Sequence, residues 1–367
     1  MSKDPQACKA ELIAHFDPDQ VGTFNGRLFG LPFGPEEAEV VLIPVPWEAT
    51  VSYRAGTAQG PAAILAASPQ LDFYDPDLPD GWQTGVALLP IPTDWAETND
   101  LVRKKARVCI EILESGGDPN SDAVRLLAKA VNDSCRELLA WVEATATHWL
   151  SQGKLVGVLG GDHSSPLGLM RALAAREPAF GILQIDAHCD LRQAYQTFEL
   201  SHASIMYRAL ESPAVERLVQ VGIRDYCRAE AELAAASGGR VQLFTDRELR
   251  RRRLAGASWA ALCAEVVATL PPRVYISFDI DGLDPTLCPQ TGTPVPGGLQ
   301  FEEVFYLIEE VVASGRQVIG FDLCEVSAGG AEGGDSWDAM VGARVLWRLA
   351  HLAAASQGRT PQPWRGR

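Results

Sequence analysis

The stretch Gln184-Ile-Asp-Ala-His-Cys-Asp190 decides how the rest of the chain is interpreted. It overlaps the apolar run Phe180–Ile185, which predicts a short core strand. Asp186, His188 and Asp190 are two residues apart, and alternate side chains of a strand share one face. Two carboxylates and an imidazole on one face are costly unless a positive charge compensates them. They suit a Zn, Mn, Fe or Ni ion, and the alternative is a solvated acidic turn after a core strand.

The composition of the 367 residues is that of a globular protein, with 47% hydrophobic and 22% charged residues. The net charge of −15 argues against nucleic acid or an anionic membrane as partner and is compatible with a cationic substrate. No apolar run is long enough for a transmembrane helix, which needs about 18 residues or more. The polar N-terminus and eight scattered cysteines indicate a protein without a secretory signal and with reduced thiols, so we expect a cytoplasmic location.

Strand-like and helix-like segments alternate along most of the chain. This order predicts an α/β fold whose mainly parallel sheet is covered by helices on both faces. We expect a polar N-terminal arm over residues 1–38, a single domain over 39–357 and a flexible tail over 358–367. The expected strands are residues 40–45, 86–91, 155–159, 180–185, 218–222, 241–244, 274–278 and 318–323.

Two further segments place polar side chains at the ends of expected strands. They are Gly160-Gly-Asp-His-Ser164 and Ser277-Phe-Asp-Ile-Asp281. Carboxyl ends of parallel strands meet at one edge of the sheet, where sites form. Two imidazoles and four carboxylates suit two metal ions about 3.5 Å apart, bridged by carboxylates and a water. The predicted metal ligands are His163, Asp186, His188, Asp190, Asp279 and Asp281.

These three motifs, in this order and spacing, resemble those of the ureohydrolase family (arginase, agmatinase and relatives) over roughly residues 40–350. The resemblance implies a three-layer α/β/α sandwich, assembly into trimers or hexamers, and two divalent ions per chain, Mn²⁺ or Ni²⁺. It implies that Glu325 pairs with a substrate guanidinium and that His202 shuttles protons. The alternatives are an ordinary acidic residue at a strand end for Glu325 and a surface residue near a helix cap for His202.

The resemblance also implies a reaction. A metal-bridging hydroxide attacks the guanidinium carbon held by Glu325, and Asp190 relays the proton to the departing nitrogen. The products are urea or a substituted urea, together with an amine or ammonia. The expected substrate is a small cationic guanidino compound: agmatine, guanidine, a guanidino acid or a biguanide.

Two positions depart from the arginase pattern. Arg192 stands where arginases have an asparagine that grips the α-carboxylate, and Cys227 stands near the position of an aspartate that receives the α-amine. Both changes argue against L-arginine and favour the agmatinase-like group. Arg192 binds a substrate carboxylate or pairs with an acid such as Glu199. Trp47, with Glu48 and Tyr53 in the same loop, is a candidate substrate contact or a packed loop residue.

Other functions remain open within this resemblance. A formiminoglutamase-type hydrolase would use Arg192 as the carboxylate partner. A non-catalytic subunit of a hetero-oligomer with a paralogue is an alternative of another class, although such subunits usually lose ligands. Histone-deacetylase-like enzymes share this fold but use one zinc ion and a different ligand set, so the complete set of six ligands disfavours them. We expect a homo-oligomer.

Overall fold

The computed structural model describes residues 5–329 and 336–366 of the chain. Its centre is an eight-stranded sheet with the order β2-β1-β3-β8-β7-β4-β5-β6, in which every neighbouring pair is parallel. The strands are β1 (Val40–Val45), β2 (Val86–Leu88), β3 (Leu155–Gly160), β4 (Phe180–Ile185), β5 (Val215–Ile223), β6 (Val241–Thr245), β7 (Arg273–Asp279) and β8 (Gln317–Cys324).

The strands are buried on both faces, because the side chains that point to either face of the sheet pack against a layer of helices. In β1, Val40 and Leu42 belong to one hydrophobic cluster, whereas Val41 and Ile43 belong to the other. Continuous apolar runs are typical of such two-sided burial in parallel sheets. The sheet therefore separates two cores.

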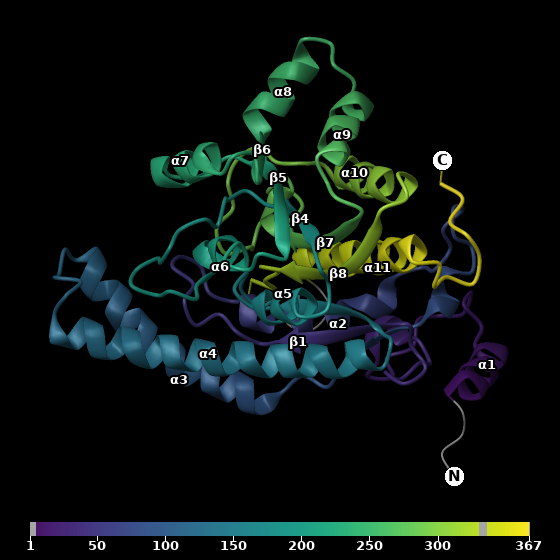
Figure 1. The fold of residues 1–367 in the computed structure, drawn as a ribbon. Helices are drawn as coiled ribbons and strands as arrows, with labels where there is room; N and C mark the ends of the chain where they lie inside the picture. The colour runs from purple at the N-terminus through teal and green to yellow at the C-terminus, as the bar shows by residue number, and fades with distance from the viewer. Residues whose placement is uncertain (1–4, 330–335, 367) are drawn as a thin grey trace.

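Two layers of helices cover the sheet and produce a three-layer α/β/α sandwich (Figure 1). One layer contains α2 (Gly60–Ala67), α8 (Asp246–Leu254), α9 (Trp259–Ala268), α10 (Phe301–Ala313) and α11 (Trp337–Ser356). The other contains α3 (Thr93–Glu114), α4 (Asp122–Ser151), α5 (Leu167–Ala174), α6 (Ile205–Ala209) and α7 (Arg228–Ala236). The predicted fold class is confirmed.

Several boundaries differ from the sequence predictions. Two helices were not predicted from the sequence: α1 (Pro5–His15) lies in the segment expected to be a polar arm, and α8 follows β6. Both have few buried side chains, so neither shows the apolar periodicity that identifies an amphipathic helix. Strand β2 ends at Leu88 rather than at residue 91, before Pro90, which lacks the N–H that a sheet requires. The 3-10 helices are η1 (Leu28–Gly30), η2 (Thr57–Gln59), η3 (Ser68–Gln70), η4 (Gly81–Thr84), η5 (His202–Ser204) and η6 (Ile280–Gly282).

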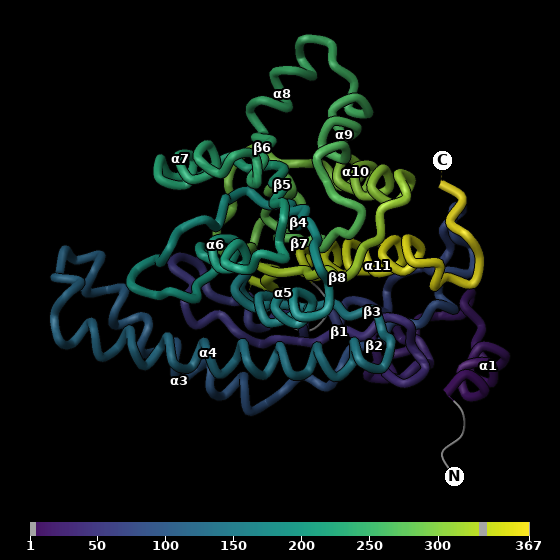
Figure 2. The backbone as a smooth tube through the Cα atoms, viewed as in Figure 1, coloured from purple at the N-terminus to yellow at the C-terminus, as the bar shows by residue number. Residues whose placement is uncertain are grey.

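Both terminal segments lie against the body of the domain (Figure 2). In the segment predicted as an arm, Phe29 and Phe33 are fully buried in the core on the α11 side of the sheet. In the segment predicted as a flexible tail, Trp364 packs against the same core and Gln362 Nε2 donates to Asp80 Oδ2 at 2.7 Å. In the described part of the chain, no helix is long and apolar enough to cross a bilayer.

Candidate metal centre

Four neighbouring strands deliver the site. Strands β3, β8, β7 and β4 lie side by side in the middle of the sheet. Their carboxyl ends lead to His163, Glu325, the pair Asp279 and Asp281, and the segment 186–190. Because the strands are parallel, all of these residues reach the same edge, as predicted.

The turn after β3 brings His163 to this edge. The Gly161 amide donates to the Val45 carbonyl at 3.0 Å, and the Asp162 amide donates to the Trp47 carbonyl at 2.7 Å. A Cβ atom at residue 161 would overlap the carbonyl oxygen of Trp47, so this close approach of two backbones requires glycine. The second glycine of the Gly160-Gly161 pair therefore has a steric reason.

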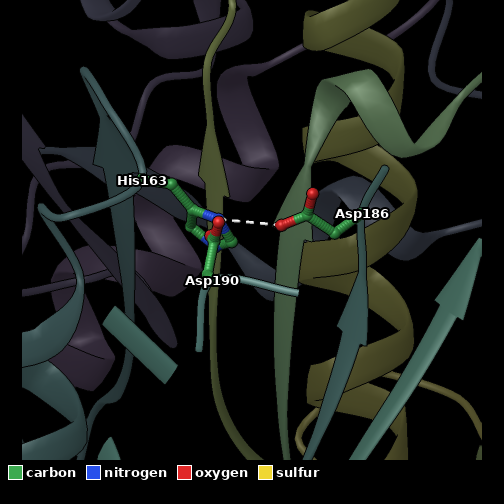
Figure 3. A group of neighbouring side chains, drawn as sticks. All are labelled: His163, Asp186 and Asp190. Atoms are coloured by element: carbon green, nitrogen blue, oxygen red, sulfur yellow. Dashed lines mark ion pairs between the residues drawn. The ribbon is translucent and has the colours of Figure 1, made fainter. Parts of the chain in front are cut away.

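One group of possible ligands surrounds His163. Its Nδ1 atom lies 2.9 Å from Asp190 Oδ2, 3.0 Å from Asp186 Oδ2 and 3.4 Å from Asp279 Oδ2. Figure 3 shows His163, from the turn after β3, beside Asp186 and Asp190, which both belong to the segment after β4. Three carboxylate oxygens around one imidazole nitrogen form the kind of N/O set that binds a divalent ion.

A second group surrounds His188. Its Nδ1 atom lies 3.2 Å from Asp281 Oδ2 and 3.5 Å from Asp186 Oδ1. The two oxygens of Asp186 therefore face different histidines, and Asp186 belongs to both groups. A carboxylate shared in this way is suited to bridging two ions. The structure thus brings all six predicted ligands together.

Hydrogen bonds around His163 leave one nitrogen free for a metal. His163 Nε2 lies 2.9 Å from Ser277 Oγ, and Ser277 Oγ donates to Asp322 Oδ2 at 2.9 Å. Because Ser277 donates to Asp322, it accepts the proton of Nε2, so Nδ1 is the nitrogen that would offer its lone pair to a metal ion. Nδ1 is buried without a hydrogen-bond partner among the described residues. The donor set and this orphaned nitrogen fit a bound divalent ion.

The electrostatics of the site also favour cations. Burial, and then the negative charge of Asp186, raise the pKa of Asp190 to about 7. Burial, and then the charge of Asp281, raise the pKa of Asp279 well above its usual range. Burial opposes a charge on His163, yet the carboxylates of Asp186 and Asp190 raise its pKa well above the usual value. Crowded, buried carboxylates of this kind are stabilised when divalent ions neutralise them.

Two residues of the site have left-handed backbones. Asp190 has φ 54° and Glu325 has φ 63°. This conformation is uncommon outside glycine, costs about 1–3 kcal/mol, and concentrates at functional sites. Hydrogen bonds fix both residues: the Asp190 carbonyl accepts from the Met206 amide at 3.1 Å, and the Glu325 amide donates to the Gly161 carbonyl at 2.9 Å.

A cavity of about 280 Å³ opens over the two groups, large enough for a small substrate. Glu325 lines it, and its Oε1 accepts from the His163 amide at 2.9 Å. Burial, and then the charge of Asp162, raise the pKa of Glu325 well above its usual range, so a cationic ligand would stabilise its carboxylate. The lining residues are Ser52, Tyr53, His163, His188, Asp190, Arg192, Tyr195, His202, Ala203, Asp225, Tyr226, Glu230, Asp279, Thr293, Pro294, Val295 and Glu325.

His202 also lines the cavity. Its ring meets the ring of Tyr195 edge-on, with centroids 6.0 Å apart. Burial, and then the positive charges of His188 and His163, lower the pKa of His202 to about 3. Its Nδ1 has no hydrogen-bond partner among the described residues. The imidazole of His202 is therefore neutral near pH 7.

Arg192 lies in the cavity wall but pairs differently from the sequence prediction. Its Nε lies 3.9 Å from Glu230 Oε2, and its guanidinium lies over the Tyr195 ring at 4.9 Å. Glu199, the partner suggested from sequence, instead accepts from Arg136 at 3.1 Å. The suggestion that Arg192 pairs with Glu199 is therefore wrong. Its partner, Glu230, lies in α7 and is remote from Arg192 in sequence, so spacing along the chain does not indicate the pair.

Trp47 does not reach the cavity. Its side chain is fully buried and packs edge-on against Trp95, with centroids 6.1 Å apart. It continues the alternation of Val41, Ile43 and Val45, whose side chains all belong to the core on the α4 side of the sheet. Trp47 is therefore a core residue, and the interpretation as a substrate contact is corrected.

The loop that follows Trp47 contributes only its outer part. Glu48 Oε2 accepts from the Gly56 amide at 2.6 Å and from the Ala58 amide at 3.2 Å, so it braces the loop. Tyr53 lines the cavity and is 69% exposed. Asp225 and Glu230 also line the cavity and were not predicted from the sequence, although Asp225 follows an apolar strand in the same way as the predicted ligands.

Comparisons with known proteins agree with this geometry. Residues 38–351 match the model of the arginase family. The N(1)-aminopropylagmatine ureohydrolase of Thermus thermophilus is 33% identical over 80% of this chain and 85% of the relative. An agmatinase of Bacillus anthracis is 28% identical over 80% of this chain and 84% of the relative. The crystal structure of agmatine ureohydrolase from Thermoplasma volcanium has a TM-score of 0.67 and 26% identity, covering 94% of this chain and 97% of that one.

Fold, ligand groups and relatives lead to one assignment. The family's members are hydrolases that act on C–N bonds of linear amidines and depend on two metal ions. The chain belongs to the arginase family and is similar to agmatinase-like ureohydrolases within it.

Proposed function

We propose that this protein hydrolyses a C–N bond of a small cationic guanidino compound, with two divalent ions bound by six residues. The observation that carries the proposal is that Asp186 belongs to both ligand groups, whose histidines, His163 and His188, line the same cavity as Glu325. The proposed ligands are His163, Asp186, His188, Asp190, Asp279 and Asp281. When bound, such ions supply Lewis acidity that activates a water molecule as nucleophile.

The chain's own side chains have distinct proposed roles. Glu325 binds the guanidinium, because a carboxylate matches its planar fork of donors and fixes its orientation. Asp190 holds or relays a proton towards the departing nitrogen, and neutral His202 exchanges protons between the cavity and solvent. Water adds to the guanidinium carbon, one C–N bond breaks, and urea and an amine are released.

A panel of substrates tests the proposal. Purified protein would be loaded with Mn²⁺ or with Ni²⁺ and assayed for urea, and for amine where the product is not urea. The panel would hold agmatine, N(1)-aminopropylagmatine, L-arginine, guanidinobutyrate, guanidinopropionate, guanidine and dimethylbiguanide. We expect turnover of at least one compound other than L-arginine. No turnover of any of them by protein with two bound metals per chain would contradict the proposal.

Three companion proposals need their own measurements. Metal analysis would decide between Mn²⁺ and Ni²⁺. Light scattering of the purified chain would test for a homo-oligomer, with a trimer or hexamer expected, and copurification from its source would reveal a paralogous partner. Cell fractionation would test the cytoplasmic location.

A further inference from the structure

The wall of the cavity beyond the metal centre contains an acidic residue that the proposed reaction does not use. Asp225 follows β5 and lines the cavity. Its backbone pairs with that of His188, and its amide donates to the Ala187 carbonyl at 3.1 Å. Adjacent strands lie about 4.8 Å apart, so the backbone of Asp225 lies beside that of His188, while the Asp225 side chain is exposed at the wall of the cavity.

A network around Arg224 holds this part of the wall in place. The Arg224 amide donates to the Ala187 carbonyl at 2.8 Å. Its guanidinium donates to the Asp281 carbonyl at 2.7 Å and to the Val295 carbonyl at 3.0 Å. One side chain thus ties the end of β5 to the segment of the metal ligand Asp281 and to Val295, another residue that lines the cavity. Asp225 is therefore presented from a fixed backbone.

The charges of the cavity leave Asp225 uncompensated. Asp190 and Asp279 belong to the metal centre, and Glu325 is assigned to the guanidinium. Glu230 is buried, lies beside Arg192, and accepts from the Cys227 amide at 2.8 Å. The carboxylate of Asp225 is exposed and has no hydrogen bond or ion pair to any described residue.

We propose that Asp225 is a specificity-determining residue that binds a second positive charge at the far end of the substrate. This inference rests on the proposed function of the site. The substrate class would be guanidino amines, in which an ammonium group follows the guanidinium along an alkyl chain. A guanidino acid of the same length would bring its carboxylate towards Asp225 and be disfavoured. Arg192 is the competing feature, because its guanidinium could receive that carboxylate.

Three compounds with the same four-carbon chain separate these cases. Agmatine ends in an ammonium, butylguanidine in a neutral methyl group and 4-guanidinobutyrate in a carboxylate. In metal-loaded protein we expect kcat/KM to fall in that order. In Asp225→Asn the ratio of kcat/KM for agmatine to that for butylguanidine should fall about five- to tenfold, mainly through KM, because an ion pair at a cavity mouth is partly screened by water.

A matched control lies on the same strand. Glu216 is exposed near the start of β5, at the end remote from the site, and Glu216→Gln should leave the ratio within about twofold. A second measurement needs no variant and therefore still applies if Asp225→Asn does not fold. Higher ionic strength should lower the ratio of kcat/KM for agmatine to that for butylguanidine in the unmodified protein.

The outcomes distinguish the two proposals. An unchanged ratio in Asp225→Asn, or a ratio insensitive to salt, would overturn the role of Asp225 while leaving guanidine hydrolysis intact. A preference for 4-guanidinobutyrate that Arg192→Gln abolishes would assign the far end of the cavity to Arg192 instead. If none of the three compounds is hydrolysed by protein with two bound metals, while guanidine or a biguanide is, the guanidino-amine class is wrong. If no guanidino compound is hydrolysed, the proposed function itself fails.

Discussion

Replacing Ser277 by alanine would test whether the buried hydrogen bonds behind His163 prepare it to bind metal. Ser277 Oγ lies 2.9 Å from His163 Nε2 and 2.9 Å from Asp322 Oδ2, and all three side chains are buried. Without the hydroxyl, Asp322 keeps the Tyr275 hydroxyl at 2.8 Å and the Phe278 amide at 3.1 Å. The main loss therefore falls on the N–H of His163.

The magnitude follows from that single orphaned donor. A buried donor that loses its partner costs about 1–3 kcal/mol of folding free energy. Its imidazole is also freer to rotate or to change tautomer, and losing such a partner lowers metal affinity by roughly 10- to 100-fold. We expect the metal-affinity effect to be the more specific one, because Nδ1 of the same ring faces three carboxylate oxygens.

Two assays would measure these effects. Chemical denaturation of metal-free protein gives the stability change, and titration against a chelator of known affinity gives the metal dissociation constant. Ser314→Ala is a suitable control, since Ser314 Oγ donates to the Val311 carbonyl near the end of α10, away from the site. If Ser277→Ala binds metal as tightly as the unmodified protein and the control, the assigned tautomer and its role are incorrect.

Three further predictions concern the centre, the turn before it and the response to pH. Asp279→Ala should abolish turnover and reduce bound metal together, as measured by metal analysis after gel filtration; full activity with full metal content would contradict the ligand assignment. Gly161→Ala should lower the unfolding temperature by several degrees or prevent folding, because the new Cβ overlaps the Trp47 carbonyl. Gly153→Ala is the comparison: its Cβ would meet open space, so only the left-handed backbone at residue 153 opposes it, and the free energy of unfolding should fall by about 1 kcal/mol. Burial raises the pKa of Asp338 to about 6 from 3.8, so the folded state holds this proton more tightly than the unfolded state. The protonated carboxyl therefore contributes its full stability below about pH 4, and this contribution is lost as the pH rises to about 6. Unfolding free energies of unmodified protein and Asp338→Asn, measured from pH 4 to 8, should therefore diverge across that window and run parallel above pH 7; parallel curves throughout would show that Asp338 has an ordinary pKa.

The sequence by itself determined the metal motifs. The spacing of Asp186, His188 and Asp190 is a local property, because a strand repeats every two residues whatever surrounds it. The apolar runs before the motifs are equally local, so the strands and the edge at which their ends meet could be predicted. Boundaries of weakly amphipathic helices such as α1 and α8 could not, because contacts with the rest of the fold decide whether they form.

Only the tertiary structure decided which strands are neighbours and which remote side chains meet. Strands β3, β8, β7 and β4 are adjacent although β8 is last in sequence, and this order places Glu325 between two ligand-bearing strands. Arg192 meets Glu230 rather than Glu199, and Asp225 lies beside His188, because parallel strand pairing joins segments that sequence separates. Trp47 depended on both. The sequence shows that it is two residues after Val45 and so in step with the alternating side chains of β1, but only the packing on the α4 side of the sheet shows that its side chain is buried there, beyond the end of the strand.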